Sequence, residues 1–580
     1  MKRLILVAIA ALMAAACGEK VVVERWRVLE IPFTASQDYS ESGADAVRMD
    51  VTFTLVKPDG EETPGADDGI ASKLTVPAFW DGGDRFLVRF TPIREGKWSW
   101  VTSCDQDEAL DGLKGRLQCV GYSGDLELYR HGFVSAEAGT KYMRHADGTP
   151  FFYLGDTHWG MYTEEIDEAG PHAGDISTDS HFKYIVHRRA QQGFTVYQSE
   201  PIGSPFDLTD GKVDQKDIEG FRTADRYYRA IADEGLVHAN AEFFFASDMS
   251  REFTDSQLES MARYWVARFG AYPVFWTLAQ EVDNDFYHER GQTWYDWTCN
   301  PWVKVAEYIH KYDAYRHPLS AHQENAWYTT ITGKGTMEDK SAISGAGESA
   351  FASEEAAERT GHNWWAVQWS PSLTEMQQDS LIEDYAASPF PAINYEGRYC
   401  NLWTKDFGSR AQGWISLLSG FSGYGYGAVD MWLYKSTYDI HSTSFDGVDR
   451  ITPEDKDVPW SVALEFESAR QMGYLRDYFK SFDWWRLEPV LTGDGLFSPE
   501  PGALCSFART PDRMVLYFYS GGTAAGSIKG FKPTEKHSVA WFNPRTGEKA
   551  LAQCLAASGE GVLTLPQKPD GEDWVLSITK

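Results

Sequence analysis

The sequence predicts an α/β protein, in which a (β/α)8 TIM barrel is flanked by N-terminal and C-terminal antiparallel β-sandwich domains. The chain has 580 residues, which is too many for one hydrophobic core and suits about three domains. Strand-like and helix-like segments alternate in its middle, as in a parallel sheet, whereas both ends contain only strand-like runs. We place a leader at residues 1–16 and domains at residues 17–134, 135–482 and 483–580.

The leader has the features of an export signal. Lys2 and Arg3 precede an apolar run over residues 4–13, and three alanines then lead to Cys17. This order resembles a bacterial lipoprotein signal, in which the cysteine is lipidated and becomes the mature N-terminus. The apolar run is too short to span a bilayer. We therefore expect a protein anchored to the cell envelope through Cys17, at the outer membrane and facing either the periplasm or the surface.

The first domain is predicted to contain only strands and turns. Residues 49–55 and 86–90 alternate apolar and polar side chains, and residues 57–60 form a turn cluster. Residues 79–84 are typical of a hairpin turn that leads into the strand at 86–90. Residues 483–580 show the same character, with strand-like runs at 514–519, 538–542 and 574–578 and a turn at 543–547.

The middle domain has eight short apolar segments that we interpret as parallel strands. A helix follows the first of them, with Phe182, Ile185, Val186 and Ala190 on one face. An open doubly wound sheet is the alternative, but no glycine-rich phosphate loop follows the first strand. The eight predicted strands are residues 150–156, 193–200, 236–245, 274–281, 319–323, 364–369, 392–396 and 423–432.

Composition restricts the partners. A net charge of −31 repels nucleic acid and anionic lipid. The 22 Trp and 29 Tyr residues suit sugar stacking, although most aromatic residues of large β-rich proteins are core. Cys104 with Cys119, and Cys505 with Cys554, are possible disulfides in an oxidising compartment. No metal-ligand spacing appears, and we expect neither a metal nor a cofactor.

Two glutamates stand at the predicted carboxyl ends of barrel strands, where barrel active sites lie. Glu281 ends the fourth strand and Glu396 ends the seventh. Cleavage of a glycosidic bond requires one carboxyl group to protonate the leaving oxygen and another to attack the sugar or activate water. A single glutamate at a strand end is more often a salt-bridge partner, so the pair carries the prediction.

Other strand ends would complete a polar pocket with an aromatic floor. We expect Asp156 and His158 to bind sugar hydroxyls and Trp159 to stack on a sugar, with Asp156 as the reserve catalytic acid. Arg398 and Arg410 could meet an anionic sugar, or simply pair with local carboxylates. The other strand-end candidates are Gln198, Glu200, Gln280, His322, Gln323, Gln368, Trp369, Asp430 and Trp432.

The chain resembles the apiosidase-like family of bacterial glycoside hydrolases, which combine an N-terminal sandwich, a barrel and a C-terminal domain named for collagen binding. The matching motifs are Asp147-Gly148-Thr149-Pro150-Phe151-Phe152-Tyr153-Leu154-Gly155-Asp156-Thr157, Gly193-Phe194-Thr195-Val196, Tyr395-Glu396-Gly397-Arg398-Tyr399, Arg410-Ala411-Gln412-Gly413-Trp414, Gly423-Tyr424-Gly425-Tyr426-Gly427, Trp541-Phe542-Asn543-Pro544-Arg545-Thr546-Gly547 and Asp573-Trp574-Val575-Leu576.

Resemblance to the wider superfamily of retaining barrel glycosidases implies that Glu281 is the acid/base and Glu396 the nucleophile. Gln280 stands where an asparagine commonly contacts the sugar 2-hydroxyl. The apiosidase branch has a Gly-Gly-Asp type motif at the fourth strand, whereas this chain has Gln280-Glu281, so apiose specificity is not implied. We expect a retaining hydrolase of a polysaccharide or oligosaccharide. A non-catalytic glycan-binding surface lipoprotein and a matrix adhesin acting through residues 485–580 are the alternatives.

Overall fold

A computed structural model describes most of the chain. The described residues are 21–56, 72–164, 166, 180–240, 253–278, 302–323, 358–368, 382, 390–402, 404–432, 458–519, 522–523 and 525–580. The predicted leader and its Cys17 therefore lie outside the described residues. Within the described residues, no helix has both the length and the apolar character needed to cross a membrane.

The N-terminal region forms two sheets. A five-stranded sheet has the order β1-β8-β7-β3-β4 and a three-stranded sheet the order β2-β6-β5. Phe53 on β3 stacks on Phe90 on β6 at 3.7 Å between ring centroids, so the facing sides of the two sheets pack together. Their strands are β1 (Val21–Glu24), β2 (Leu29–Thr34), β3 (Asp50–Val56), β4 (Lys73–Pro77), β5 (Phe79–Trp80), β6 (Arg85–Phe90), β7 (Gly96–Ser103) and β8 (Lys114–Val120), with the short helix η1 (Ala44–Ala46) after β2.

The hairpin predicted in this region is confirmed. Trp80 on β5 pairs with Phe86 on β6 in antiparallel register, and the amide of Asp81 donates to the carbonyl of Arg85 at 2.8 Å. The positive φ of 89° at Gly82 and 61° at Gly83 suits the tight turn between the two strands.

The middle region is built on one parallel sheet of eight strands, in the order β15-β14-β13-β12-β19-β18-β17-β16. The sheet curls, because residues next to one edge strand hydrogen-bond to the other edge. Trp276 bridges to Leu319, and the amide of His322 donates to the carbonyl of Thr277 at 3.0 Å. The strands are β12 (Tyr153–Thr157), β13 (Val196–Ser199), β14 (Val237–Asn240), β15 (Val274–Trp276), β16 (His322–Gln323), β17 (Trp365–Gln368), β18 (Ala392–Glu396) and β19 (Gly423–Tyr426).

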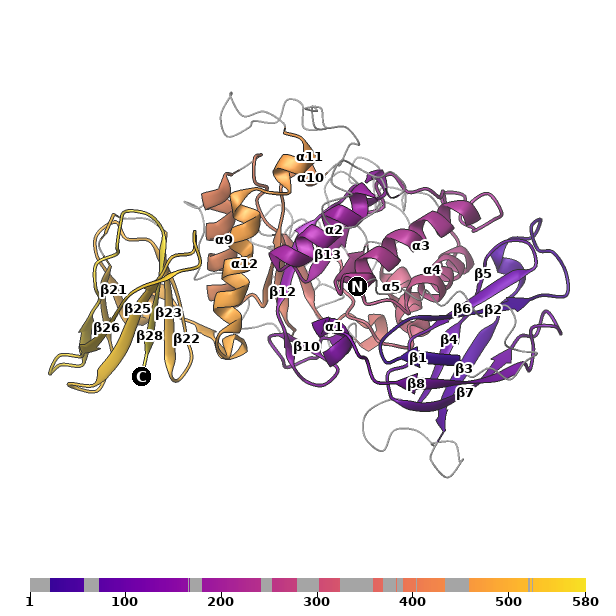
Figure 1. Ribbon diagram of the computed structural model, residues 1–580, viewed down its shortest axis with the longest axis horizontal. Coiled ribbons are helices and arrows are strands. Elements are labelled where there is room, and N and C mark those ends of the chain that lie inside the picture. Colours follow the sequence, from indigo (N-terminus) through magenta and orange to yellow (C-terminus); the bar gives the residue numbers. More distant parts are fainter. Residues whose placement is uncertain are drawn as a thin grey trace, which may run out of the picture.

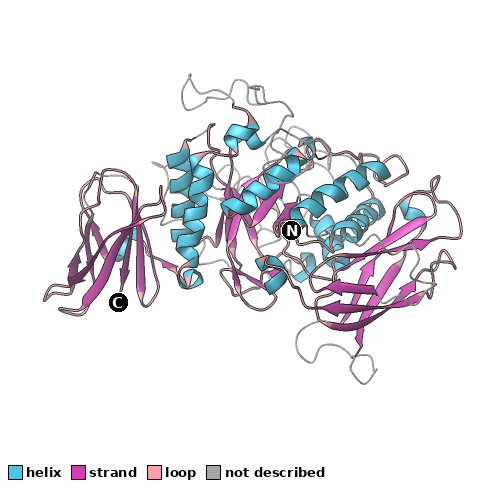
Figure 2. Ribbon diagram, viewed as in Figure 1, coloured by secondary structure: helices cyan, strands magenta, loops and turns pink. Residues whose placement is uncertain are grey.

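Helices cover the outside of this sheet (Figures 1 and 2). The helix predicted after the first strand is α2, which begins after the side-chain cap Ser180 and buries Phe182, Ile185 and Val186. The helices are α1 (Glu127–His131), η2 (Met161–Thr163), α2 (His181–Gln192), α3 (Ile218–Asp233), α4 (Asp255–Phe269), α5 (Trp302–Tyr312), α9 (Asp406–Leu418), α10 (Val429–Trp432), α11 (Trp460–Ala463), α12 (Glu467–Lys480) and η5 (Trp484–Arg486). A small antiparallel sheet of β9 (Val134–Ser135), β10 (Met143–His145) and β11 (Pro150–Phe151) precedes β12.

Aromatic rings fill the inside of the curled sheet. Tyr153 on β12 lies between Phe275 on β15, at 6.0 Å, and Trp364 beside β17, at 6.1 Å. Phe151, which lies on β11 just before β12, meets Phe275 edge-on. These rings belong to one buried cluster with Tyr395 of β18. The interior is therefore a packed apolar core at the amino ends of the strands, which leaves the carboxyl ends for polar side chains.

The C-terminal region again forms two sheets, of six strands (β20-β22-β23-β28-β25-β26) and three strands (β21-β24-β27). In Figure 1 the helices α9 and α12 stand side by side between these sheets and the parallel sheet. The predicted turn at 543–547 is confirmed, since the amide of Gly547 donates to the carbonyl of Asn543. The elements are β20 (Glu488–Pro489), η6 (Thr492–Asp494), β21 (Phe497–Pro499), β22 (Cys505–Arg509), β23 (Arg513–Phe518), β24 (Gly526–Lys529), β25 (Lys536–Phe542), β26 (Lys549–Ala556), β27 (Val562–Thr564) and β28 (Trp574–Thr579).

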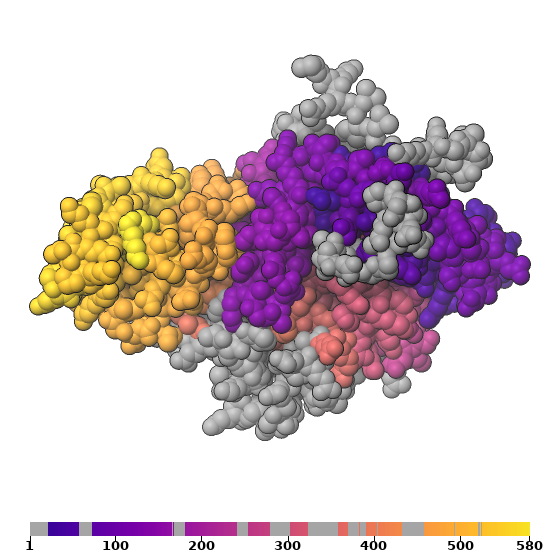
Figure 3. Space-filling model, turned by 90° about the horizontal axis from the view of Figure 1, so that it is seen from below, coloured from indigo at the N-terminus to yellow at the C-terminus, as the bar shows by residue number. Residues whose placement is uncertain are grey.

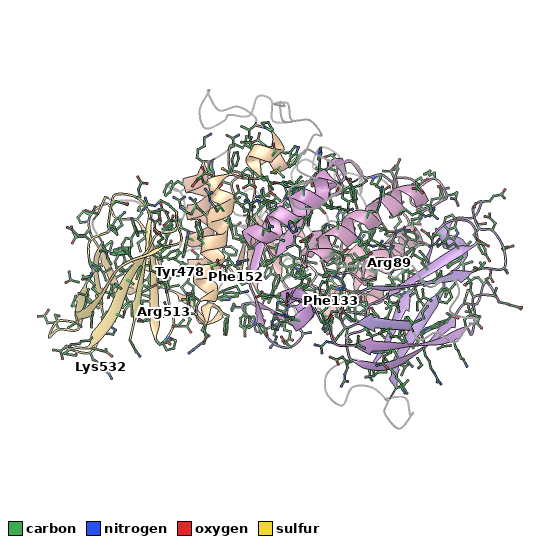
Figure 4. All side chains as sticks on the ribbon, in the orientation of Figure 1. Arg89, Phe133, Phe152, Tyr478, Arg513 and Lys532 are labelled. Carbon is green, nitrogen blue, oxygen red and sulfur yellow. The ribbon has the colours of Figure 1, made fainter. Side chains whose placement is uncertain are left out.

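Buried ion pairs join the N-terminal sheets to the middle region. Arg89 of β6 and Arg268 of α4 both bind the carboxylate of Asp225 on α3, each at 2.7 Å. Arg268 also reaches Asp81, at 3.3 Å. All four residues are buried, and Figure 4 shows Arg89 where the sheets meet the helices.

The C-terminal sheets are joined to the middle region in a similar way. Arg410 on α9 makes a two-point contact with the buried carboxylate of Asp573, at 2.7 and 2.9 Å, and Tyr517 donates to the same carboxylate. Tyr478 of α12 pairs with Ser577 of β28 at 2.5 Å. The space-filling view in Figure 3 shows the regions in a row, with the C-terminal sheets at one end.

Two expectations about local structure are corrected. The eighth strand, predicted over residues 423–432, ends at Tyr426, and residues 429–432 form the short helix α10.

The five described cysteines are free. Cys119 lies opposite Gly96 at the start of β7, whereas Cys104 follows the end of that strand; Cys505 and Cys554 lie on strands separated by three others. Strand geometry thus holds the members of each expected pair apart.

Candidate active site

The predicted strand-end residues gather at the carboxyl ends of the parallel strands. Gln198 is on β13, Glu200 directly follows that strand, His322 is on β16 and Glu396 ends β18. All four are buried, with Glu396 the most exposed of them at 4%. The structure therefore brings together side chains that lie nearly 200 positions apart in the sequence.

Each oxygen of the Glu396 carboxylate lies close to a polar side chain. The hydroxyl of Tyr399 donates to Oε1. The Nε2 atom of His322 lies 3.0 Å from Oε2. Trp159 donates its indole N–H to the oxygen of Tyr399 at 2.5 Å, so the Tyr399 hydroxyl is directed at Glu396. These contacts fix the orientation of the carboxylate.

His322 stands between two carboxylates. Its Nδ1 atom lies 3.5 Å from Oε1 of Glu200, on the side opposite Glu396. The Trp159 ring stacks on the imidazole at 5.4 Å, and Tyr395 meets it edge-on at 5.0 Å. Burial alone would lower the pKa of His322, but the hydrogen bonds and charges of Glu200 and Glu396 outweigh it and raise the pKa to about 10. The ring is therefore an imidazolium at neutral pH.

The loop after Glu396 is held by the next helix. Gln412 of α9 accepts a hydrogen bond from the backbone amide of Arg398 at 2.6 Å. A Cβ atom at Gly397 would lie 2.5 Å from the same Gln412 oxygen, so a larger residue there would displace the Gln412 side chain. The position of Tyr399 thus depends on packing between this loop and α9.

Gln198 crosses the inside of the sheet. It donates from Nε2 to the carbonyl of Tyr395 on β18 at 2.8 Å, passing over the two strands in between. A Cβ atom at Gly155 would lie 1.9 Å from its Oε1, and one at Gly425 would lie 2.8 Å away. The glycines of β12 and β19 make the space for this amide, which braces β18 just before Glu396.

Asp156 and His158 belong to a separate buried network. Oδ2 of Asp156 contacts Nε of Arg189 on α2 and Nε2 of His158, each at 2.5 Å, and Nδ1 of His158 contacts Glu164 at 2.7 Å. Side chains alternate along a strand, and Gly155 faces the inside next to Gln198, so Asp156 faces α2. Their observed partners are thus protein groups on the outer side of β12, and not the surroundings of Glu396.

Electrostatics agrees with this placement. Burial would raise the pKa of Asp156, but the charges of Arg189 and His158 hold it below its usual value. Burial would lower the pKa of His158, but Glu164 and Asp156 raise it to about 9. Burial keeps the pKa of Glu164 above its ordinary value despite its contact with His158.

Several other predicted residues have assigned places. Arg410 pairs with Asp573, which supports the carboxylate interpretation over the anionic-sugar one. Asp430 is on α10 and accepts from Asn401 at 2.8 Å. Gln368 ends β17, and the half-buried Arg398 lies in the loop after Glu396. Gln280, Glu281 and Trp369 lie outside the described residues, as does the side chain of Trp432.

Tyr399 was not singled out as a site residue from the sequence. The signal available was its position three residues after Glu396 in the same loop. Spacing alone could not show that its hydroxyl turns back to the carboxylate. Among the described residues, no group of three or more His, Cys, Asp or Glu side chains is arranged to hold a metal ion.

The fold and this site define a glycoside hydrolase-like α/β protein. A family model described as "Apiosidase-like, catalytic domain" matches residues 137–486, which is more than half of the chain. The chain therefore belongs to the apiosidase-like family. Residues 22–105 match a domain of unknown function (DUF5060), and residues 500–579 match a domain family described in terms of collagen binding. These matches agree with the resemblance stated from the sequence motifs.

Solved structures show the same fold at low sequence identity. A Bacteroides vulgatus ATCC 8482 protein, assigned provisionally as a glycoside hydrolase, has a TM-score of 0.63 at 16% identity, over 97% of this chain and 100% of that one. A family 5 glycoside hydrolase from the same organism has a TM-score of 0.57 at 16% identity, over 78% of this chain and 94% of that one. Another glycoside hydrolase gives 0.55 at 18% identity, over 79% and 99%. No curated protein matches significantly.

Proposed function

We propose that this protein hydrolyses glycosidic bonds of a complex polysaccharide or glycan with net retention, using Glu281 and Glu396. The observation that carries the proposal is the buried Glu396 carboxylate at the end of β18, with Tyr399 and His322 on its two oxygens. A carboxylate held in one orientation in this way suits a nucleophile. Membership of the apiosidase-like family supports the same class of reaction.

The proposal includes the finer architecture. We infer that the parallel sheet is a closed (β/α)8 barrel, which the hydrogen bonds between residues 319–322 and β15 support. We infer that the paired sheets on either side are β-sandwiches, which the stacking of Phe53 on Phe90 supports for the N-terminal pair. In a barrel, Glu281 would end the fourth strand and Glu396 the seventh, facing each other across the mouth.

The proposed reaction has two steps. Glu281 protonates the glycosidic oxygen while Glu396 attacks the anomeric carbon, which forms a covalent glycosyl-enzyme and releases the leaving group. Glu281 then takes a proton from water, which attacks the anomeric carbon and frees Glu396. Two carboxyl groups about 5–5.5 Å apart are required for this mechanism. Tyr399 and His322 orient Glu396, and they stabilise its negative charge before the first step and after the second.

The proposed setting is the cell envelope. Lipidation at Cys17 would tether the protein to a membrane, where it meets a polysaccharide or oligosaccharide substrate. The Lys2-Arg3 start, the short apolar run and the alanines before Cys17 support this location. Globomycin treatment, which blocks lipoprotein signal cleavage, should leave a larger precursor, and Cys17→Ser should release the protein from membranes. Wild-type protein found in the soluble fraction, or no larger precursor with globomycin, contradicts the anchor.

The test is product release from a panel of plant, host and microbial polysaccharides. Glu281→Gln and Glu396→Gln should each lose at least about 100-fold in rate, as expected when acid–base or nucleophilic assistance is removed. Glu560→Gln, at an exposed turn of the C-terminal sheets, is the matched control and should keep the full rate. NMR of the first product should show the anomeric configuration of the substrate. Inversion, or full activity in either site variant, contradicts the proposal, and binding without cleavage favours a glycan-binding protein.

A further inference from the structure

The contact between Glu200 and His322 has no role in the two chemical steps. Glu200 is fully buried after β13, and its carboxylate lies 3.5 Å from the Nδ1 atom of His322. The opposite ring nitrogen lies 3.0 Å from Glu396. Glu200 after β13, His322 on β16 and Glu396 on β18 thus form a carboxylate–imidazole–carboxylate row.

The chemistry of imidazole makes this row informative. A neutral imidazole donates from only one of its nitrogens and presents a lone pair at the other. With a carboxylate at each nitrogen, the neutral ring would turn a lone pair toward one negative charge. Both contacts are favourable only when the ring is an imidazolium. Glu200 therefore supplies the second negative charge that retains the proton on His322.

The surroundings leave the ring little freedom. Trp159 stacks on one face of His322, and Tyr395 meets it edge-on. The same Trp159 directs Tyr399 toward the other oxygen of Glu396. Among the described residues, the titratable side chains facing His322 are Glu200 from the end of β13 and Tyr395 and Glu396 from β18.

We propose that Glu200 is a positioning residue, which acts through His322 to hold Glu396 in one orientation in the active site. The inference deepens the function proposed above, because it assigns how the nucleophile is held. Loss of the Glu200 charge frees His322 to become neutral and to release Oε2 of Glu396. The carboxylate can then rotate about the hydrogen bond from Tyr399.

The first test is independent of any substrate. Histidine side chains labelled with ¹⁵N report the protonation of each ring nitrogen, and His322→Gln identifies the signal. In the wild-type protein the His322 ring should still be an imidazolium at pH 8. A neutral ring at pH 8 overturns the proposal, whether or not the protein is a glycosidase.

The second test uses matched variants. Glu200→Gln keeps the shape and removes the charge, and should lower the titration midpoint of His322 by about one pH unit or more. Glu200→Asp keeps the charge, so the titration midpoint of His322 should stay close to that of the wild-type protein. Glu164→Gln alters the corresponding contact of His158 and should not move the His322 midpoint. An unchanged midpoint in Glu200→Gln, or equal shifts in all three variants, overturns the proposal.

The third test applies once the substrate panel has given an activity. Glu200→Gln should lower kcat about 10-fold to 100-fold with a smaller change in KM, because a misplaced nucleophile slows chemistry more than binding. The alkaline limb of its pH profile should move to lower pH, and Glu200→Asp should restore most of the rate. A loss confined to KM contradicts the positioning role. If no glycan is cleaved, the NMR tests still decide the Glu200–His322 contact separately from the proposed function.

Discussion

Two histidines in the described part of the chain are buried between pairs of carboxylates. His158 contacts Asp156 and Glu164, and His322 contacts Glu200 and Glu396. Each imidazolium neutralises charges that would otherwise be costly to bury. Of the two, only His322 adjoins the proposed nucleophile. The same arrangement of one imidazole between two carboxylates therefore lies once in a structural network and once in the candidate site.

Stability should depend on these rings above neutral pH. The folded-state pKa values are raised to about 9 for His158 and about 10 for His322. A raised pKa contributes stability that is fully present below the unfolded value, about 6.5, and is lost as the pH rises through the folded value. We expect Tm to fall steadily between pH 7 and pH 9 in calorimetry, and less steeply in Glu164→Gln. A flat or rising Tm over this range is inconsistent with two buried imidazolium ions.

Asp156→Asn separates a structural carboxylate from a sugar-binding one. It leaves Arg189 and His158 buried without their charge partner, and removing one member of a buried pair costs about 3–5 kcal/mol. Urea unfolding measures this loss. Asp147→Asn is the control, because its contact with His131 is exposed and such pairs contribute about 1 kcal/mol or less. Equal stabilities of the two variants would contradict the buried network.

At the scale of single elements, the glycines of β12 and β19 set the spacing inside the parallel sheet. A Cβ atom at Gly425 would lie 1.9 Å from the carbonyl oxygen of Tyr395, on the neighbouring strand that carries Glu396. Because the obstacle is backbone, a side chain cannot simply rotate away. Glycine here fits a close approach of two strands rather than an unusual turn.

Gly425→Ala should therefore destabilise the protein by about 1–3 kcal/mol or more, as overpacking does in a dense core. It should also weaken the Gln198 contact that braces β18. Gly493→Ala, with no atom within 4 Å of its Cβ position, should stay within about 0.5 kcal/mol of wild type. Denaturant midpoints compare the two variants. A tolerated alanine at Gly425 would mean that β18 and β19 are further apart than described.

The sequence predicted strands well where they are short, apolar and bounded by turns. The strand predicted over residues 392–396 coincides with β18, whereas the one predicted over residues 423–432 extends beyond the end of β19 at Tyr426. Gly423-Tyr424-Gly425-Tyr426 alternates as a strand does, and the apolar residues beyond it carry no clear stop signal. Beyond the strand, Ala428 forms a bridge to Cys400, which lies 28 positions earlier in the sequence. A pattern read from neighbouring residues cannot predict a contact over this separation.

The candidate site was predictable only in part for a related reason. The rule that polar residues collect at strand ends found Glu396, His322 and Gln198. It could not decide which face of β12 carries Asp156, because a one-residue change of phase moves every side chain to the opposite face. Tyr399 lies in the loop after a strand, where the path of the backbone depends on packing against α9. The alternation of apolar and polar residues that predicts a strand does not extend to such a loop.

At the scale of the molecule, the N-terminal sheets share a buried charge cluster with α3 and α4. Asp225→Asn should cost about 3–5 kcal/mol, because it removes the carboxylate that the buried Arg89 and Arg268 share. Thermal unfolding should show the loss. Asp233→Asn, on the same helix but in an exposed pair with Arg27, should change stability by about 1 kcal/mol or less. A comparable effect of the two changes would contradict a buried joint.

Helix α9 connects the C-terminal sheets to the proposed nucleophile. Asp573 binds Arg410 on α9, and Gln412, two residues further along the same helix, accepts a hydrogen bond from the amide of Arg398. Arg398 lies two residues after Glu396. For protein engineering, the C-terminal region is therefore not an interchangeable module. A chimera that exchanges residues 483–580 while losing the Asp573 contact should alter the alignment of Glu396, the proposed nucleophile. If the proposed function holds, the chimera would have a lower kcat although no residue around Glu396 had been changed.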